Sequence, residues 1–195
     1  MRVLVVAEGK HERGGALEEL LKRLGDRQAT FESDRVQNNR IHTHPGKGQG
    51  YFKRAIRWLL EAQKRGVDAL VLLIDEDGQS KRVEQINAAQ ESPQSALPRA
   101  LGVAIRTFDA WMLADEKALT DVLGRQIDKQ PDPESVRDPK HQCADLLASS
   151  SSRIAQSEMY ARVCRCLDLD VLRARCRRGF GPFAERVRNV FEPSG

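Results

Sequence analysis

Near the start of the chain runs Val3-Leu4-Val5-Val6-Ala7-Glu8-Gly9, and a matching stretch, Ala69-Leu70-Val71-Leu72-Leu73-Ile74-Asp75-Glu76-Asp77-Gly78, follows later. Each is a short apolar run that ends in acidic residues and a glycine. Such a run, bounded by turn signals, is typical of a strand buried on both faces of a parallel sheet. Because the carboxyl ends of parallel strands meet at one edge, where open α/β sheets bind ligands, we expect both acidic groups at that edge.

The acids after these runs predict a metal site. Glu8 and Glu12 are four residues apart, so they can share one face of a helix that begins near Lys10, while Asp75 and Asp77 alternate on an extended segment and point the same way. Aspartate is also a common turn residue, so the Asp-x-Asp pair alone is weak evidence for metal binding. Carboxylates gathered at one place resist ionising together unless a cation lies between them, and Mg²⁺ or Mn²⁺ suits their hard oxygen atoms.

Alternating strands and helices predict an α/β fold with a mostly parallel four-stranded sheet flanked by helices. Apolar runs indicate strands at 2–7, 69–74 and 101–106, and the more polar stretch 28–37 is a candidate for a further strand. Helical periodicity indicates helices at 14–24, 51–65 and 81–89, and a further helix that contains Phe108 to Asp115. Residues 40–50 are expected to form a loop. Trp58 and Trp111 stand among apolar residues at helical spacing, which favours core packing over base stacking.

The carboxyl-terminal third is predicted to be a small helical appendage. Residues 128–139 contain three prolines and many charges, as expected of a linker or surface loop. Beyond them the pattern indicates helices near 141–148, 157–166, 168–175 and 182–191. We therefore divide the chain into an α/β domain, 1–127, and a helical, arginine-rich extension, 128–195, packed on the same core.

The basic charge is concentrated in this extension. Residues 151–195 hold 9 basic and 5 acidic side chains, so the whole formal excess of +4 lies there. Arg175, Arg177 and Arg178 form its densest group. Arginine forks onto phosphate oxygens, so an arginine-rich face beside acidic metal ligands suits a nucleic acid, although a solvated helix face is the plainer interpretation of charge alone.

Composition favours a cytoplasmic protein. Hydrophobic residues make up 40% of the chain and charged residues 31%, as in ordinary globular domains. No apolar stretch approaches the roughly 20 residues that a membrane span needs, and the amino terminus shows no signal segment. The four cysteines, Cys143, Cys164, Cys166 and Cys176, lack the paired spacing of structural zinc sites, so we expect them reduced and on helices.

The order of the acids resembles the Toprim domain of topoisomerases, primases and OLD-family (overcoming lysogenisation defect) nucleases. There a glutamate follows the first strand and an Asp-x-Asp the third, as Glu8 and then Asp75 and Asp77 do here. A phosphoaspartyl hydrolase would instead carry its Asp-x-Asp after the first strand. The resemblance implies a Toprim-like sheet on which glutamate acts as metal ligand or general acid/base.

A closer resemblance, spanning nearly the whole chain, is to the Toprim-like domain-of-unknown-function family 4276. It rests on Glu8-Gly9 with Glu12, Ile74 to Asp77, Phe108 to Asp115, Pro139-Lys140, Leu169 to Leu172, and Cys176 leading to Phe180 and Phe183. Members of the family read Glu-Ala-Trp-Leu-Leu-Ala-Asp in the third of these segments. Asp109 stands here where that glutamate is expected, so a shorter carboxylate would have to reach the metal.

The resemblance implies metal-dependent phosphodiester hydrolysis, often beside an ABC- or SMC-type ATPase in bacterial defence against phage. In that interpretation Glu8, Glu12, Asp75 and Asp77 hold two metal ions, with Asp109 a further ligand. Glu8 also transfers the proton, and Lys140 stabilises charge on the scissile phosphate. Arg175, Arg177 and Arg178 grip the nucleic acid, with DNA favoured over RNA. The alternative is a non-catalytic regulatory or nucleic-acid-binding subunit of an ATPase complex, and the number of copies, including a homo-oligomer, stays open.

Overall fold

The fold is centred on a parallel sheet of four strands. A computed structural model of the chain describes residues 1–38, 41 and 50–192, so of the loop expected at 40–50 only Ile41 and Gly50 are described. The strands are β1 Arg2–Ala7, β2 Thr30–Arg35, β3 Ala69–Asp75 and β4 Arg99–Ala104. Their order across the sheet is β2-β1-β3-β4, and every pair is parallel, as the sequence predicts.

The register of the strands brings the acidic segments to one edge. Ala7 of β1 pairs with Leu73 of β3, and Asp75 at the end of β3 pairs with Ala104 of β4. Glu8, the first residue after β1, therefore lies beside the last residues of β3. The end of β2, Arg35, lies on the other side of β1, opposite Ala7.

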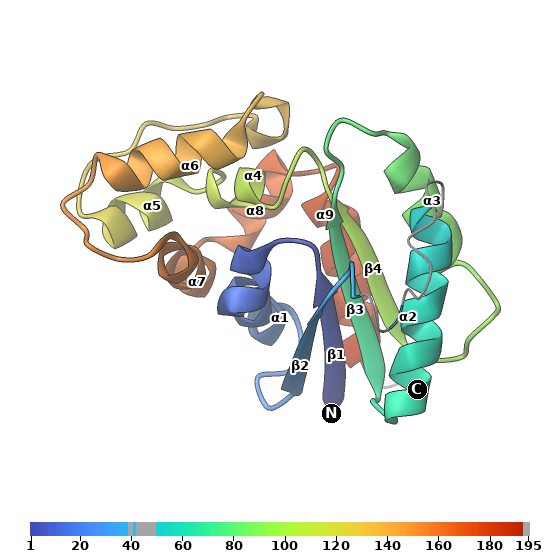
Figure 1. The fold of residues 1–195 in the computed structure, drawn as a ribbon. Helices are drawn as coiled ribbons and strands as arrows, with labels where there is room; N and C mark the ends of the chain where they lie inside the picture. The colour runs from blue at the N-terminus through green and yellow to red at the C-terminus, as the bar shows by residue number, and fades with distance from the viewer. Residues whose placement is uncertain (39–40, 42–49, 193–195) are drawn as a thin grey trace.

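Helices cover both faces of the sheet and form a group beside it (Figure 1). They are η1 Glu12–Ala16, α1 Leu17–Leu24, α2 Tyr51–Arg65, α3 Lys81–Gln90, α4 Asp109–Met112, α5 Glu116–Leu123, η2 Pro133–Ser135, α6 Pro139–Ala148, α7 Gln156–Cys166, α8 Leu169–Arg175 and α9 Phe180–Phe191. Within the described residues, no helix is both long enough and apolar enough to cross a bilayer.

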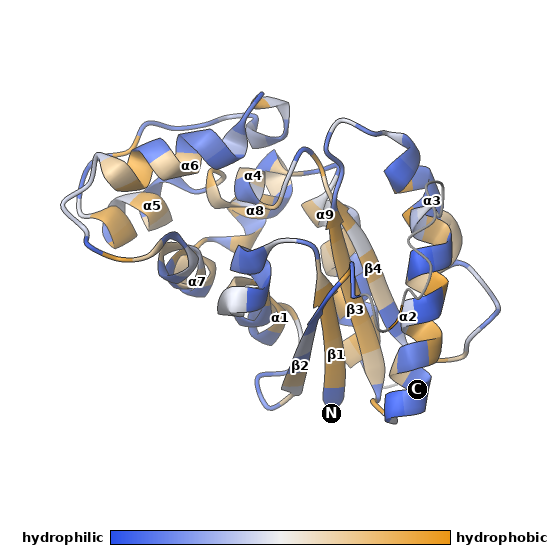
Figure 2. Cartoon of the chain, in the orientation of Figure 1, coloured by the Kyte–Doolittle hydropathy of each residue, from blue (hydrophilic) through white to orange (hydrophobic). Residues whose placement is uncertain are grey.

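One face of the sheet is covered by α2 and α3. Leu4 and Leu72 of the sheet are fully buried in one apolar cluster with Trp58, Leu59 and Ile86 of these helices. Figure 2 shows the matching apolar stripe on α2, whose other side is polar. Burying a side chain of this size contributes about 2 kcal/mol to stability. These contacts therefore hold the connecting helices α2 and α3 against the sheet.

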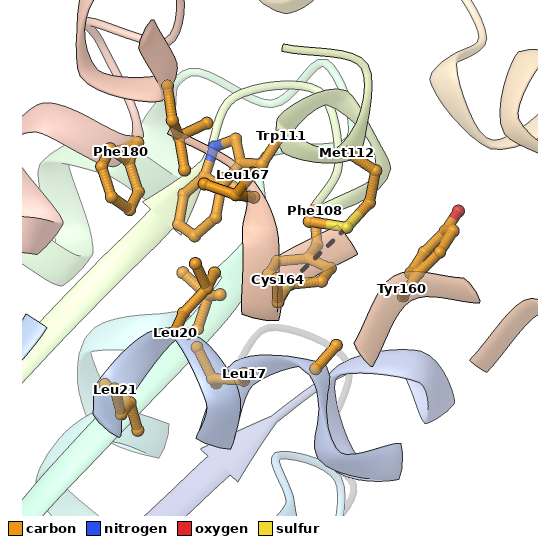
Figure 3. Close-up of a cluster of buried hydrophobic side chains, with 14 of the residues drawn as sticks. Leu17, Leu20, Leu21, Phe108, Trp111, Met112, Tyr160, Cys164, Leu167 and Phe180 are labelled. Carbon is orange, nitrogen blue, oxygen red and sulfur yellow. Dashed lines mark hydrogen bonds between the residues drawn. The ribbon is translucent and has the colours of Figure 1, made fainter. Parts of the chain in front are cut away.

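The opposite face is covered by α1 and α9, and its core continues into the remaining helices. Leu17 and Leu20 of α1 belong to the same buried cluster as Trp111 of α4 and Cys164 of α7, and Figure 3 shows these side chains together. Val187 of α9 is part of this cluster too. The prediction that both tryptophans are core residues is confirmed, because neither Trp58 nor Trp111 is exposed.

Several boundaries differ from the sequence prediction. The helix expected through Phe108 to Asp115 is interrupted, because the Asp115 carboxylate accepts hydrogen bonds from the amides of Lys117 and Ala118 and begins α5 instead. Strand β4 begins and ends two residues earlier than the range 101–106. The helix expected at 14–24 begins earlier and kinks at Gly15, whose φ is 104°.

The proline-rich stretch 128–139 is more ordered than a plain linker. It contains η2, and Glu134 within it is almost fully buried. The Glu134 carboxylate accepts hydrogen bonds from the amides of Arg178 at 3.0 Å and Gly179 at 2.7 Å. These bonds satisfy the two amide donors directly before α9, so this stretch helps fix the last helix against the sheet.

Candidate functional site

Glu8 is fixed at the carboxyl edge by two neighbouring elements. Its Oε2 accepts a hydrogen bond from the Asp75 amide at 3.0 Å, which ties the end of β1 to the end of β3. Its Oε1 accepts a hydrogen bond from the Tyr51 hydroxyl of α2 at 2.5 Å. Burial and the bond to Glu8 raise the pKa of Tyr51, so the tyrosine stays a proton donor to Glu8.

Asp75 is the most electrostatically perturbed carboxylate of this edge. Its Oδ1 accepts a hydrogen bond from the Phe108 amide at 2.8 Å, which orients the side chain toward the segment after β4. Burial, followed by the negative charges of Glu12, Glu8 and Asp77, raises the pKa of Asp75 to about 8, against the opposing effect of the Phe108 bond. The negative charges of three other acidic side chains thus act on Asp75.

Glu12 is buried in the turn after β1, and the close approach of Gly9 makes room for it. A Cβ on Gly9 would lie 2.0 Å from Glu12 Oε2, so only glycine fits there while the carboxylate keeps its position. Burial raises the pKa of Glu12, and the charges of Asp109 and Glu8 add to the effect. Glu12 thus links the acidic edge to Asp109.

Arg82, on the first turn of α3, supplies a positive charge to the edge that the sequence prediction did not include. Its Nη1 lies 2.8 Å from Asp77 Oδ2 and 3.6 Å from Glu8 Oε2, and it donates to the Asp75 carbonyl at 2.6 Å. The guanidinium also lies over the Tyr51 ring, 4.6 Å from its centroid. Only the α3 crossover brings Arg82 here, and no sequence motif marks it.

Asp109 lies in a second buried polar group behind Glu12. Its carboxylate accepts a hydrogen bond from the Tyr160 hydroxyl of α7, and the Cys143 thiol lies 3.5 Å from its carbonyl oxygen. His11 packs against Tyr160 with ring centroids 5.0 Å apart, and burial lowers the pKa of His11. Asp109 is therefore electrostatically coupled to Glu12 while its carboxylate is engaged by α7.

The basic residues predicted to contact the phosphate and the nucleic acid do not form one group in the structure. Lys140 is exposed on the first turn of α6, near enough to His11 to contribute to that lowered pKa. Arg175 donates to the Ala114 carbonyl at 2.6 Å and pairs with Glu116.

The other two predicted arginines follow α8. Arg178 pairs with Glu134 at 3.4 Å, whereas Arg177 is exposed and donates to the Ala174 carbonyl at 2.9 Å. Two of the three arginines predicted to grip nucleic acid, Arg175 and Arg178, thus already have carboxylate partners.

Comparison with known protein families shows which family the chain belongs to. The model of a domain-of-unknown-function family, DUF4276, matches residues 7–188. The chain belongs to this family. No curated protein and no solved structure matches the chain.

The segments on which the DUF4276 resemblance rests meet in the fold. Trp111 of α4 packs against Phe180 and Phe183 of α9, with ring centroids 5.3 Å and 5.6 Å apart. Phe108, beside Trp111, donates its amide to Asp75. The aromatic cluster therefore sets the position of the segment that orients Asp75.

The donor chemistry of the DUF4276 edge fits a hard divalent cation, because its side chains are carboxylates whose crowding raises the pKa of Asp75. Among residues 1–38, 41 and 50–192, however, no group of three or more His, Cys, Asp or Glu side chains is arranged so that it could hold a metal ion. The carboxylates point instead to protein partners: Glu8 to Tyr51, Asp75 to Phe108 and Asp77 to Arg82.

Proposed function

We propose that this protein is a Mg²⁺- or Mn²⁺-dependent phosphodiester hydrolase of Toprim type, that is, a nuclease. The observation that supports the proposal is the crowded acidic edge, where burial and neighbouring carboxylates raise the pKa of Asp75 to about 8. Such a shift is a cost to the free protein that a bound cation would relieve, and perturbed carboxylates of this kind gather at functional sites.

Within this proposal Glu8, Glu12, Asp75 and Asp77 would hold the metal, with Asp109 behind Glu12 as a further carboxylate. The bound ions would supply Lewis-acid stabilisation of the phosphate and a more acidic water. Glu8 would accept a proton from the attacking water as the water oxygen bonds to phosphorus and the P–O bond to the leaving oxygen breaks, and the leaving oxygen would take its proton from solvent. Tyr51 and the Asp75 amide would hold Glu8 in place for that transfer. Lys140 would offset negative charge on the phosphate.

The proposed partners are a nucleic acid, with DNA favoured, and an ABC- or SMC-type ATPase, in a cytoplasmic system for defence against phage or for DNA maintenance. The resemblance to Toprim nucleases supports the ATPase, and the acidic edge together with the basic carboxyl-terminal segment supports the nucleic acid. Arg177, exposed after α8, would contribute to backbone contacts at the periphery.

One observation favours a second candidate, a non-catalytic Toprim-fold subunit. Arg82 already neutralises part of the acidic edge through Asp77 and Glu8, as a cation would. A protein whose edge is permanently closed by this guanidinium would keep the fold and bind partners without hydrolysis.

Plasmid nicking with Mn²⁺ separates the two candidates. We expect the wild-type protein to nick supercoiled DNA, and Glu8→Gln and Asp75→Asn to lose at least about 100-fold in rate, because each loses a carboxylate that acts on the reacting groups. Asp121→Asn, which removes an exposed carboxylate on α5, is the matched control and should retain full activity. Equal rates for all four proteins would rule out the assignment of the acidic edge as the catalytic centre.

A further inference from the structure

The carboxyl edge of the sheet carries arginines on both sides of its acids. In the order of the strands, the edge presents Arg35 at the end of β2, Glu8 after β1, Asp75 at the end of β3 and Arg106 after β4. Neighbouring strands are about 4.8 Å apart, so the two arginine backbones stand roughly 14 Å from one another across the acids. Positive charge thus flanks the proposed centre on both sides.

On the β2 side the arginines line an open cleft. This cleft has a volume of about 430 Å³, and among the described residues it is lined by Glu8, Arg13, Arg35 and Gln37. The Arg13 Nε donates a hydrogen bond to the Gly9 carbonyl at 3.2 Å, which holds the guanidinium near the segment after β1. The side chain of Arg35 is exposed. In the described part of the chain neither guanidinium forms an ion pair, unlike those of Arg65, Arg82 and Arg175.

On the β4 side a second cleft lies between the sheet edge and the start of α6. It has a volume of about 250 Å³ and is lined by Asp77, Gly78, Arg106, Thr107, Arg137, Asp138 and Pro139. The backbone of Arg106 is held in a left-handed conformation, φ 63°, by hydrogen bonds with the Asp77 amide and the Glu76 carboxylate. A non-glycine residue in this conformation is strained, and such strain is common where a side chain is held for function.

We propose that the carboxyl edge binds the phosphodiester backbone of a nucleic-acid strand, with separate phosphates of that strand in the Arg13/Arg35 cleft and in the Arg106/Arg137 cleft. Guanidinium groups free of carboxylate partners are the side chains best suited to phosphate oxygens. Because the two clefts stand on opposite sides of Glu8 and Asp75, a polymer can occupy both and a single phosphate cannot. The inference rests on the proposed function only in that the strand would cross the proposed hydrolytic centre.

The test measures binding without metal and without hydrolysis. The probe is a fluorescein-labelled single-stranded DNA of about 12 nucleotides, within the roughly 4–16 that single-strand binders cover, titrated in EDTA by fluorescence anisotropy. Two double variants, Arg13→Gln/Arg35→Gln and Arg106→Gln/Arg137→Gln, each remove two positive charges from one cleft. The matched control, Arg27→Gln/Lys64→Gln, removes two exposed charges near the amino ends of the strands.

We expect each cleft variant to bind the oligonucleotide roughly tenfold more weakly and to lower the slope of log K against log salt by about 1.4, two phosphate contacts on a single strand. The control should stay within about twofold of wild type. Arg35→Gln alone, at an exposed position, should give about half the slope change if Arg13→Gln perturbs folding.

Three results would overturn the inference. They are a wild-type protein that does not bind the strand, cleft variants that bind like the control, and displacement of the strand by equimolar inorganic phosphate. If the cleft variants lose binding and the wild-type protein does not nick DNA with Mn²⁺, the proposed strand-binding site stands and the proposed nuclease activity is rejected. If nicking requires Glu8 but the cleft variants bind like the control, the nuclease activity stands and the strand-binding site is rejected.

Discussion

Asp75 makes the stability of the metal-free protein depend on pH. Its pKa is about 8 in the folded protein against an ordinary value of 3.8, so the folded state holds the proton more tightly than the unfolded state. Ionising Asp75 in the folded state therefore lowers the free energy of unfolding. This loss of stability is absent below about pH 4, grows as the pH rises toward 8 and is complete above about pH 8.

Asp75→Asn should therefore stabilise the metal-free protein by roughly 1–3 kcal/mol near pH 9 and leave it unchanged near pH 4. The asparagine Oδ1 can still accept the Phe108 amide bond, so the variant removes the charge and little else. Urea denaturation in EDTA at the two pH values measures the difference. An Asp75→Asn protein less stable than wild type at both would show that the carboxylate is not a source of strain.

Arg82 should be the main stabilising partner of the acids in the metal-free protein. Arg82→Gln leaves Asp77 and Glu8 without their cation and should lower the free energy of unfolding by roughly 2 kcal/mol in EDTA. Arg162→Gln, which breaks the exposed pair with Glu158, is the matched control and should cost less than about 0.5 kcal/mol. Denaturation midpoints of the two variants give the comparison, and equal losses would show that Arg82 is only a surface residue.

Sequence reasoning placed Glu8, Glu12, Asp75 and Asp77 at one edge because each follows a recognisable strand or opens a helix directly after one. It could not find Arg82 or Tyr51, since both are brought to the edge by crossover helices whose positions depend on packing. Nor could it anticipate that Arg175 and Arg178 pair with Glu116 and Glu134. Residue type and spacing reveal donors of charge, but tertiary contacts decide which charges are free.

At the scale of elements, the turn between β1 and η1 depends on Gly9. Gly9→Ala would place a methyl group against the Glu12 carboxylate, so we expect a loss of roughly 1–3 kcal/mol in stability and a displaced Glu12. Gly181→Ala, early in α9, meets no atom within 4 Å and should be neutral or stabilising by up to about 1 kcal/mol. Thermal unfolding of the pair is the measurement. A Gly9→Ala protein as stable as Gly181→Ala would mean that the turn is not tightly packed.

Some elements could be located from the sequence and others could not. Strand β1 and helix α2 have the predicted ends, because apolar periodicity and the left-handed Gly66 after α2 mark them clearly. The interruption after α4 was missed because Asp115 fits a helix face by spacing, and only its hydrogen bonds reveal a cap. Predictions of this kind fail where a polar side chain bonds to the backbone instead of facing solvent.

At the scale of the molecule, the prediction of a parallel α/β sheet followed by helices is confirmed, and the helices cooperate with the sheet. Helices α4 and α5, from the segment assigned to the sheet domain, contact α6 and α7 of the segment assigned to the extension. The apolar cluster of one sheet face continues among them (Figure 3). The segment that orients Asp75 is consequently supported by helices from both parts of the chain.

An anomalous difference map of a crystal soaked in Mn²⁺ would show whether the acidic edge of the sheet binds a divalent metal. We expect a peak beside the carboxylates of Glu8 and Asp75, with the ion pair between Asp77 and Arg82 opened. A map without a peak at this edge, with Arg82 still bonded to Asp77, would rule out the proposed metal site and favour the non-catalytic subunit.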